Sequence, residues 1–354
     1  MRTLEEQPTI RFAPPPGATA PAPAEARGLP RDGVRLLVAT PDGLTHGRFA
    51  DLPDHLRAGD LLVVNDSATE ARQLDARRAG PGDGQAVVVH LAMPLDDGSW
   101  VVELRTAPHA DRAVLDARPR DRIIAGPVAV TLLRPWPSGA SSPTGAGNRL
   151  WRARVTGPLS AWLREHGRPI SYGYLDRSYP LADYQTVFSV RPGSAEMPSA
   201  ARPFTDRLVT TLVSRGVAVA PITLHTGVSS QEGGEAPQPE WFEVPAGTAR
   251  LVEAVRAGHG RVVAVGTTVT RALESAVVDG HVVARRGWTD RVVTPKAPPR
   301  VVTGLVTGWH DPQASHLLLV EAVAGPRLAQ RAYDAAAAEG YRWHEFGDSA
   351  LFLP

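Results

Sequence analysis

The apolar positions of the chain form short strand-like runs and longer segments with helical spacing. The runs are rich in branched apolar residues, as buried strands are; they lie at 61–64, 217–224, 261–265 and 301–307. Segments with apolar residues at helical spacing adjoin the last three of these runs, at 206–213, 267–277 and 316–324. Alternation of the two patterns predicts an α/β domain built on a central sheet.

Residues 74–156 have a different pattern. Short β-like runs follow one another there, separated at brief intervals by Gly, Pro and Asp, and no long helical spacing occurs. This is typical of a small barrel or sandwich. The sequence therefore predicts an α/β fold with two parts. Residues 1–73 and 157–354 form a discontinuous main α/β catalytic domain, and residues 74–156 form an inserted small all-β, barrel-like domain.

Composition narrows the class of protein. The 354 residues are 43% hydrophobic and 21% charged, which is ordinary for a soluble globular protein. No apolar run approaches the roughly 20 residues that span a membrane, and the amino terminus does not look like a secretory signal. The chain has no cysteine, which excludes disulfides and thiolate catalysis. We expect a cytoplasmic monomer that has no membrane contact. The net charge of +1 shows no global basic field for nucleic acid, although a local patch would be compatible with it.

Two histidines directly follow strand-like runs. His225 comes after 217–224 and His310 comes shortly after 301–307. The carboxyl ends of strands are where open α/β sheets place ligands, and a histidine there suits proton transfer. Judged from the stretch 196–227 alone, His225 is better explained as a hydrogen-bonded structural histidine than as a functional one. Together with a third unit, the turn Gly266-Thr267-Thr268, the two histidines form a more specific constellation.

The turn Gly266-Thr267-Thr268 leads from a strand into a helix. Thr267 or Thr268 is expected to cap that helix, whose first N–H groups form an anion site. Arg271 and Glu274 share one face of the same helix, either as a surface ion pair or as a pair lining the site.

Other polar and aromatic candidates are less specific. Asn65 ends the run 61–64, where it serves either a turn or a site. A segment dense in tyrosine could stack on bases or a purine, or cover the core; its candidates are Tyr172, Tyr174 and Tyr184. The spacing of histidines and carboxylates does not match a metal site, and the chain has no Walker A loop or nucleophile elbow.

Several stretches, taken together and in order, resemble the QueA family, the S-adenosylmethionine:tRNA ribosyltransferase-isomerases of queuosine biosynthesis. The resemblance spans nearly the whole chain. Its strongest stretches are DLPDHLRAGDLLVVNDSATEARQ at 51–73, RPFTDRLVTTLVSRGVAVAPITLHTG at 202–227, RVVAVGTTVTRALES at 261–275, VVTGLVTGWHDPQASHLLLVEAVAG at 301–325 and the closing YRWHEFGDSALFL.

The resemblance implies an enzyme, an S-adenosylmethionine-dependent transferase-isomerase that needs no metal. In the family reaction S-adenosylmethionine is a co-substrate that donates its ribosyl moiety to the aminomethyl group of a 7-deazaguanine in tRNA. The ribosyl moiety rearranges to an epoxycyclopentanediol, which gives epoxyqueuosine and releases adenine and methionine. A base must remove the proton at the ribose C5′, adenine must be protonated as it leaves, and the attacking amine must be neutral.

The resemblance also suggests roles for the candidate residues. His225 and His310 would be the acid/base pair, in either order. The turn Gly266-Thr267-Thr268 would hold the methionine carboxylate or a ribose hydroxyl, with Arg271 and Glu274 supporting it or gripping the amino-acid end. The candidate substrate-binding residues are Asn65, Tyr172, Tyr174, Tyr184, Glu196, Arg202, Phe204 and Thr205.

The chain departs from the family pattern near the expected site. Glu196 and Arg202 are new charges, and Pro203 stands where the family has a histidine before Phe204. The stretches quoted above still match the family pattern, so we expect the binding site for the donor, S-adenosylmethionine, to be retained. The identity of the acceptor stays open. tRNA is the default acceptor, and a small molecule or nucleoside is the rival. A noncatalytic relative that binds S-adenosylmethionine or RNA is the third hypothesis, against which the two retained histidines argue.

Overall fold

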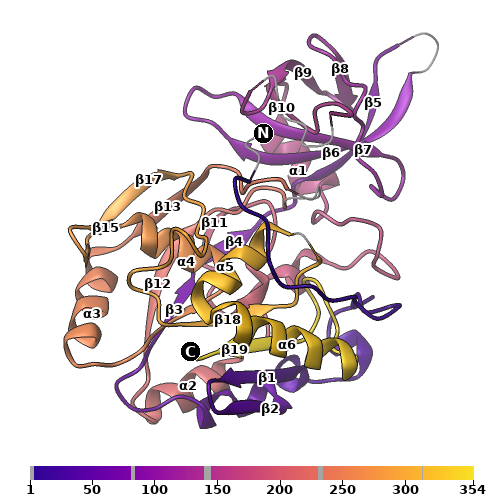
Figure 1. Ribbon diagram of the computed structural model, residues 1–354. Helices are drawn as coiled ribbons and strands as arrows, with labels where there is room; N and C mark the ends of the chain where they lie inside the picture. Colours follow the sequence, from indigo (N-terminus) through magenta and orange to yellow (C-terminus); the bar gives the residue numbers. More distant parts are fainter. Residues whose placement is uncertain (1–3, 81–83, 139–144, 230–233, 313) are drawn as a thin grey trace.

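The structure, a computed structural model, describes residues 4–80, 84–138, 145–229, 234–312 and 314–354. It contains a large mixed sheet with helices and, at one end of the molecule, a closed barrel (Figure 1). The predicted fold class, an α/β main part with a small all-β barrel, is confirmed. Within the described ranges, none of the helices has the length and apolar character needed to cross a membrane.

The main sheet has nine strands in the described part of the chain, in the order β17-β13-β12-β3-β14-β18-β19-β1-β2. Its four central strands, β12, β3, β14 and β18, are parallel, so their carboxyl ends meet at one edge. The strands are β1 (Arg35–Thr40), β2 (Gly43–Arg48), β3 (Leu61–Asn65), β12 (Ala218–Leu224), β13 (Glu240–Val244), β14 (Val262–Val265), β17 (Arg285–Thr289), β18 (Gly304–Gly308) and β19 (Ser349–Phe352).

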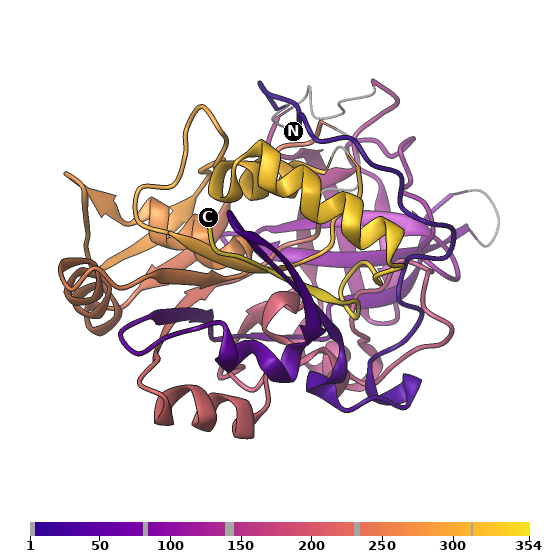
Figure 2. The same cartoon turned by 60° about the horizontal axis from the view of Figure 1, so that its bottom comes forward.

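Helices cover both faces of this sheet. Because successive strand residues point to opposite faces, Leu61 and Val63 join one core while Leu62 and Val64 join the other. The first face is covered by α3 (Ala246–Ala257), α4 (Thr267–Ser275), α5 (Ser315–Ala324) and α6 (Pro326–Ala338). The second is covered by α2 (Asp206–Ser214) and the 3-10 helix Phe49–Asp54. Figure 2 shows α6, in yellow, and α2, in salmon, on opposite sides of the sheet.

The barrel is closed by six antiparallel strands in the order β10-β7-β6-β5-β8-β9. Buried apolar side chains such as Val89, Leu104 and Ile123 fill it. Its strands are β5 (Gln73–Arg78), β6 (Gln85–Pro94), β7 (Trp100–Thr106), β8 (Arg122–Ala125), β9 (Val128–Pro135) and β10 (Leu150–Thr156). The division of the chain into a main domain and an inserted domain at 74–156 stays a prediction.

Shorter elements complete the molecule. They are β4 (Ser67–Thr69), β11 (Arg191–Ser194), β15 (Val277–Val278), β16 (His281–Val282), α1 (Leu159–His166) and the 3-10 helices Glu25–Arg27, Arg31–Gly33, Leu181–Tyr184 and Ser199–Ala201. The strand β11 pairs in parallel with β4, directly beyond the end of β3. This pairing brings the segment that follows β11, from Ala195 onward, to the carboxyl edge of the main sheet.

Candidate active site

A cavity of about 490 Å³ lies at the carboxyl ends of β14 and β18. Its lining comes from segments that are far apart in the sequence, including 196–200, 226–229, 266–268, 307–316 and 344–345. Eight of the predicted site residues are in this lining: Tyr172, Tyr174, Glu196, Gly266, Thr267, Thr268, Arg271 and His310. The structure therefore brings together the Gly-Thr-Thr turn and one of the two histidines, while the roles of these residues stay predictions.

The turn at Gly266 directs helix α4 at the cavity. Gly266 has a φ of +97°, and a Cβ there would lie 3.3 Å from the Cβ of Ala200, so this position favours glycine. The prediction that Thr267 or Thr268 caps the helix is wrong, because Gly266 occupies the N-cap and α4 begins at Thr267. Since no side chain of the described residues caps α4, its first N–H groups are left for a ligand.

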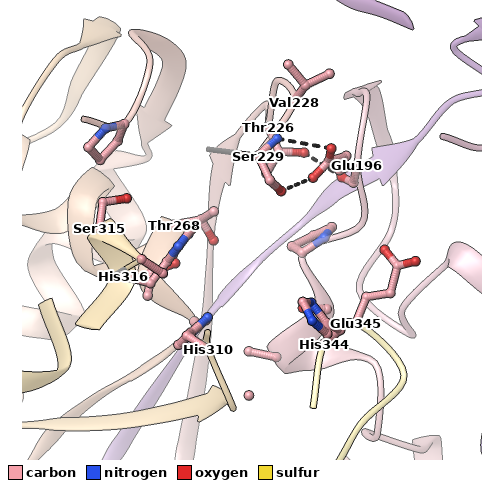
Figure 3. A pocket seen from close by; sticks show the side chains of 18 of the residues that line it. Glu196, Thr226, Val228, Ser229, Thr268, His310, Ser315, His316, His344 and Glu345 are labelled. Carbon is pink, nitrogen blue, oxygen red and sulfur yellow. Dashed lines mark hydrogen bonds between the residues drawn. The ribbon is translucent and has the colours of Figure 1, made fainter. Parts of the chain in front are cut away.

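Helix α5 begins at the same end of the cavity. Its N-cap residue, Ala314, has no capping side chain, and Ser315 is its first residue. Ser315 is only 5% exposed, and its Oγ has no hydrogen-bond partner among the described residues. Ser315, Thr268 and His316 lie on one side of the cavity, away from Glu196 and Glu345 (Figure 3). Two helix N-termini with a buried hydroxyl that no described residue bonds suit a carboxylate or another anion.

His310 lies next to His316 and below Thr268 in the view of Figure 3. Its Nε2 is 3.0 Å from Thr307 Oγ1, and its ring stacks on that of His316 with 4.7 Å between centroids. Burial, with smaller contributions from His316 and His344, holds the pKa of His310 well below its usual value. Burial likewise lowers the pKa of His316 to about 4. At neutral pH His310 is therefore an uncharged imidazole, which can accept a proton.

Arg271 and Glu274 do not pair with each other, and only Arg271 lines the cavity, so neither predicted arrangement, a surface ion pair or a pair lining the site, is present. Arg271 forms an ion pair with Glu240 and donates to the carbonyl oxygen of Gln238, so it fixes one wall of the cavity. Glu274 lies outside the lining, where its carboxylate accepts N–H groups of residues 300–302 at 2.9 to 3.1 Å. Arg271 and Glu274, both on α4, therefore hold two different loops.

Carboxylates and tyrosines form the opposite side of the cavity. Glu196 accepts hydrogen bonds from the hydroxyl of Tyr172 and from both the N–H and the Oγ of Ser229. Tyr174 donates from its hydroxyl to Oε1 of Glu345 at 2.8 Å. Burial raises the pKa of Glu196 and raises that of Glu345 to about 7. Glu345 was not among the predicted site residues, although the two polar residues between the aromatics of YRWHEF were a usable signal.

His225 does follow β12 as predicted, but it lies outside the cavity lining. Its Nδ1 is 2.8 Å from Ser67 Oγ, and its ring stacks on Trp241. Burial and the charge of Arg72 lower its pKa. The next residues along the chain, Thr226 to Ser229, do line the cavity. His225 is therefore next to the cavity wall, and its catalytic role stays a prediction.

Comparison with known proteins assigns the chain to a family. The family model described as a queuosine biosynthesis protein matches residues 9–352. The chain belongs to this family. A relative from Acidiphilium cryptum, named S-adenosylmethionine:tRNA ribosyltransferase-isomerase, is 36% identical over 350 residues, covering 95% of this chain and 96% of its own. A relative of the same name from Acaryochloris marina is 34% identical, covering 92% of this chain and 89% of its own.

A solved structure agrees with the family assignment. The crystal structure of an S-adenosylmethionine tRNA ribosyltransferase from Thermotoga maritima is similar to this chain with a TM-score of 0.53 and 26% sequence identity. The similarity covers 97% of this chain and 99% of that one. The queuosine biosynthesis fold, including both the mixed sheet and the barrel, is therefore present over essentially the full length.

Five other predicted substrate-binding residues of this queuosine biosynthesis chain do not reach the cavity. Asn65 bonds both backbone groups of Leu224 and so ties β3 to β12. The remaining four have structural partners: Tyr184 packs on Phe346, Arg202 pairs with Glu25, Phe204 packs on Phe49 in the second core, and Thr205 caps α2. These packing, pairing and capping contacts hold the four side chains outside the cavity lining.

Replacing Thr205 with alanine tests this structural assignment. The Thr205 Oγ1 accepts the N–H of Leu208 at 3.1 Å, so its loss is expected to lower the free energy of unfolding by about 1 kcal/mol. Urea denaturation measures this change. Thr205→Ser keeps the hydroxyl and should restore most of the stability. A change in substrate affinity at unaltered stability would show that Thr205 reaches the substrate instead.

Proposed function

We propose that this chain is an S-adenosylmethionine-dependent ribosyltransferase-isomerase that acts on the aminomethyl group of a 7-deazaguanine in tRNA. The observation that carries the proposal is the full-length relationship to proteins of that name, such as the 36% identical relative from Acidiphilium cryptum. The reaction moves the ribosyl moiety to the amine, rearranges it to an epoxycyclopentanediol, and releases adenine and methionine. S-adenosylmethionine is a co-substrate in this proposal.

The two sides of the cavity support an orientation for the donor. The methionine carboxylate binds at the N-termini of α4 and α5, where the Oγ of Ser315 and the N–H groups of Thr267 and Thr268 are available. Arg271 holds the adjoining wall through Glu240 and Gln238. The uncharged His310 takes the C5′ proton of the ribose and, once it is protonated in this way, can pass that proton to the departing adenine.

Adenine release tests the function. Purified protein is incubated with S-adenosylmethionine in the presence of tRNA that carries 7-aminomethyl-7-deazaguanine, of the same tRNA with guanine, or of the free modified base. We expect adenine and methionine to form only with the modified tRNA. Release with the free base alone would assign a small-molecule acceptor. Binding of S-adenosylmethionine without release under any condition would contradict the enzymatic proposal and leave a noncatalytic binding protein.

The remaining features of the proposal concern the whole molecule. We propose a cytoplasmic monomer, which light scattering would report as a single species near 37.7 kDa. We also propose that residues 74–156 are an inserted domain, since the strands between Gln73 and Thr156 close a barrel by themselves.

A further inference from the structure

Glu345 lies at the tip of a tightly held turn. The preceding Trp343 is buried in the first core with Trp309, and the following Phe346 packs on Tyr184. Between them His344 has a φ of +68°, which is uncommon for a residue with a side chain, and its carbonyl accepts the N–H of Gly347 at 3.0 Å. The two buried aromatic anchors therefore fix the position from which Glu345 enters the cavity.

The carboxylate of Glu345 is only partly satisfied by the protein. Tyr174 donates to Oε1 at 2.8 Å, and among the described residues neither oxygen has an ion-pair partner. The nearby cation, Arg202, is paired with Glu25 at 2.9 Å. The charged and titratable groups that face Glu345 are Tyr174, Tyr184, Glu196, His344 and Arg202. A carboxylate in this setting lacks a positive partner, and a cationic ligand would supply one.

Glu196 differs from Glu345 although both face the same cavity. Both of its oxygens accept hydrogen bonds, from Tyr172 and Ser229, so its task is to hold the wall. Its negative charge still acts on Glu345. Burial and, secondarily, the charge of Glu196 raise the pKa of Glu345 to about 7, so this carboxyl can exchange protons at neutral pH.

The proposed reaction supplies two primary ammonium groups, one on the acceptor and one on methionine. The methionine ammonium and carboxylate share one carbon atom. If that carboxylate binds at the N-termini of α4 and α5, the ammonium stays near Ser315 and Thr268, on the opposite side of the cavity from Glu345 (Figure 3). The side occupied by Glu345 therefore suits the acceptor amine.

We infer that Glu345 binds the ammonium group of the acceptor and removes a proton from it. In this step an N–H bond of the ammonium breaks, and the proton moves to a carboxylate oxygen of Glu345, which becomes a carboxylic acid. The electron pair of the broken bond stays on nitrogen, which becomes the neutral nucleophile that ribosyl transfer requires. The inference rests on the proposed function, and it assigns to Glu345 the recognition of an amine-bearing acceptor.

The test compares wild-type protein with Glu345→Gln, which keeps the shape of the side chain and removes its charge. With modified tRNA we expect kcat/KM for adenine release to fall at least about 100-fold, as for loss of a general base. In wild type, kcat/KM should rise with pH through about 7 as Glu345 ionises, and the variant should lose this rise. The Kd of S-adenosylmethionine alone, measured by calorimetry, should stay within about twofold of the wild-type value. A tenfold weaker Kd would correspond to a loss of about 1.4 kcal/mol of binding free energy.

Two controls keep the outcomes separate. Glu345→Asp keeps the charge and should retain the pH-dependent rise at reduced rate. Glu339→Gln changes an exposed glutamate six positions earlier in the sequence, outside the cavity lining, and should behave as wild type. Unchanged kcat/KM and pH profile in Glu345→Gln would overturn the inference. Weaker S-adenosylmethionine binding with unaltered KM for tRNA would also overturn it, by placing Glu345 at the methionine end. A wild-type protein that releases no adenine with any acceptor would instead refute the proposed function itself.

Discussion

Replacing Arg149 with methionine is expected to lower the free energy of unfolding by about 3–5 kcal/mol, as breaking a buried ion pair does. The side chain of Arg149 is 1% exposed and donates to Glu103 at 2.9 Å and to Glu235. Both carboxylates are fully buried. Methionine fills a similar volume but carries no charge. The negative charges of Glu103 and Glu235 then lose the guanidinium that helps to balance them. Urea denaturation at pH 7 measures the change.

The same substitution should also reduce adenine release. Arg149 lies just before β10 of the barrel, whereas Glu235 belongs to the segment whose Pro237 and Gln238 line the cavity. Arg149 therefore connects the barrel to the cavity wall. Arg154→Met, at an exposed position of β10, is the matched control and should change stability by less than about 0.5 kcal/mol. Equal stability of the two variants would show that the buried ion pairs contribute little.

A second variant separates charge from packing. Combining Glu103→Gln with Arg149→Met removes a buried charge of each sign, so the double variant should be less destabilised than the sum of the two single variants. Strict additivity would contradict a direct interaction. Glu103 also contacts Arg105 and His90, and these contacts keep part of the network in place in every variant.

Local patterns predicted the scaffold and part of the cavity. The apolar runs identified the central strands. Because β14 and β18 are parallel, their carboxyl ends lie at the same edge of the sheet, and this places Gly266 and His310 together. The Arg149 network could not be found this way. Its partners, Glu103 and Glu235, are 46 and 86 residues away, and each is one charged residue among many. Tertiary packing alone decides that these charges are buried together.

Packing also decides which of the strand-end histidines faces the cavity. His225 and His310 occupy equivalent positions in the sequence pattern, each after a buried strand. Gly193 leaves open the space that the His225 ring fills: a Cβ at Gly193 would lie 2.5 Å from that ring. The ring is therefore held against β11 and Trp241 rather than in the cavity. A contact of this kind depends on a glycine 32 positions away, which no local pattern reports.

Replacing His310 with alanine is expected to lower kcat for adenine release by about 10²–10⁴-fold, the usual contribution of an acid or base group. His310 lines the cavity next to His316, and its pKa lies well below the usual value, so it enters the reaction as the neutral form. Rapid-quench measurement of adenine release under saturating substrates gives kcat. The Kd of S-adenosylmethionine should change little, because the carboxylate is held by α4 and α5.

His225→Ala is the matched comparison, because this histidine also follows a central strand but lies outside the lining. Its loss removes the contact with Ser67 and the stacking on Trp241, so we expect a smaller fall in kcat, about tenfold or less, together with a modest loss of stability. The two variants thus separate proton transfer from support of the cavity wall. A larger loss of kcat in His225→Ala than in His310→Ala would make His225 the proton-transfer residue, and would require the segment that follows β12 to move when substrate binds.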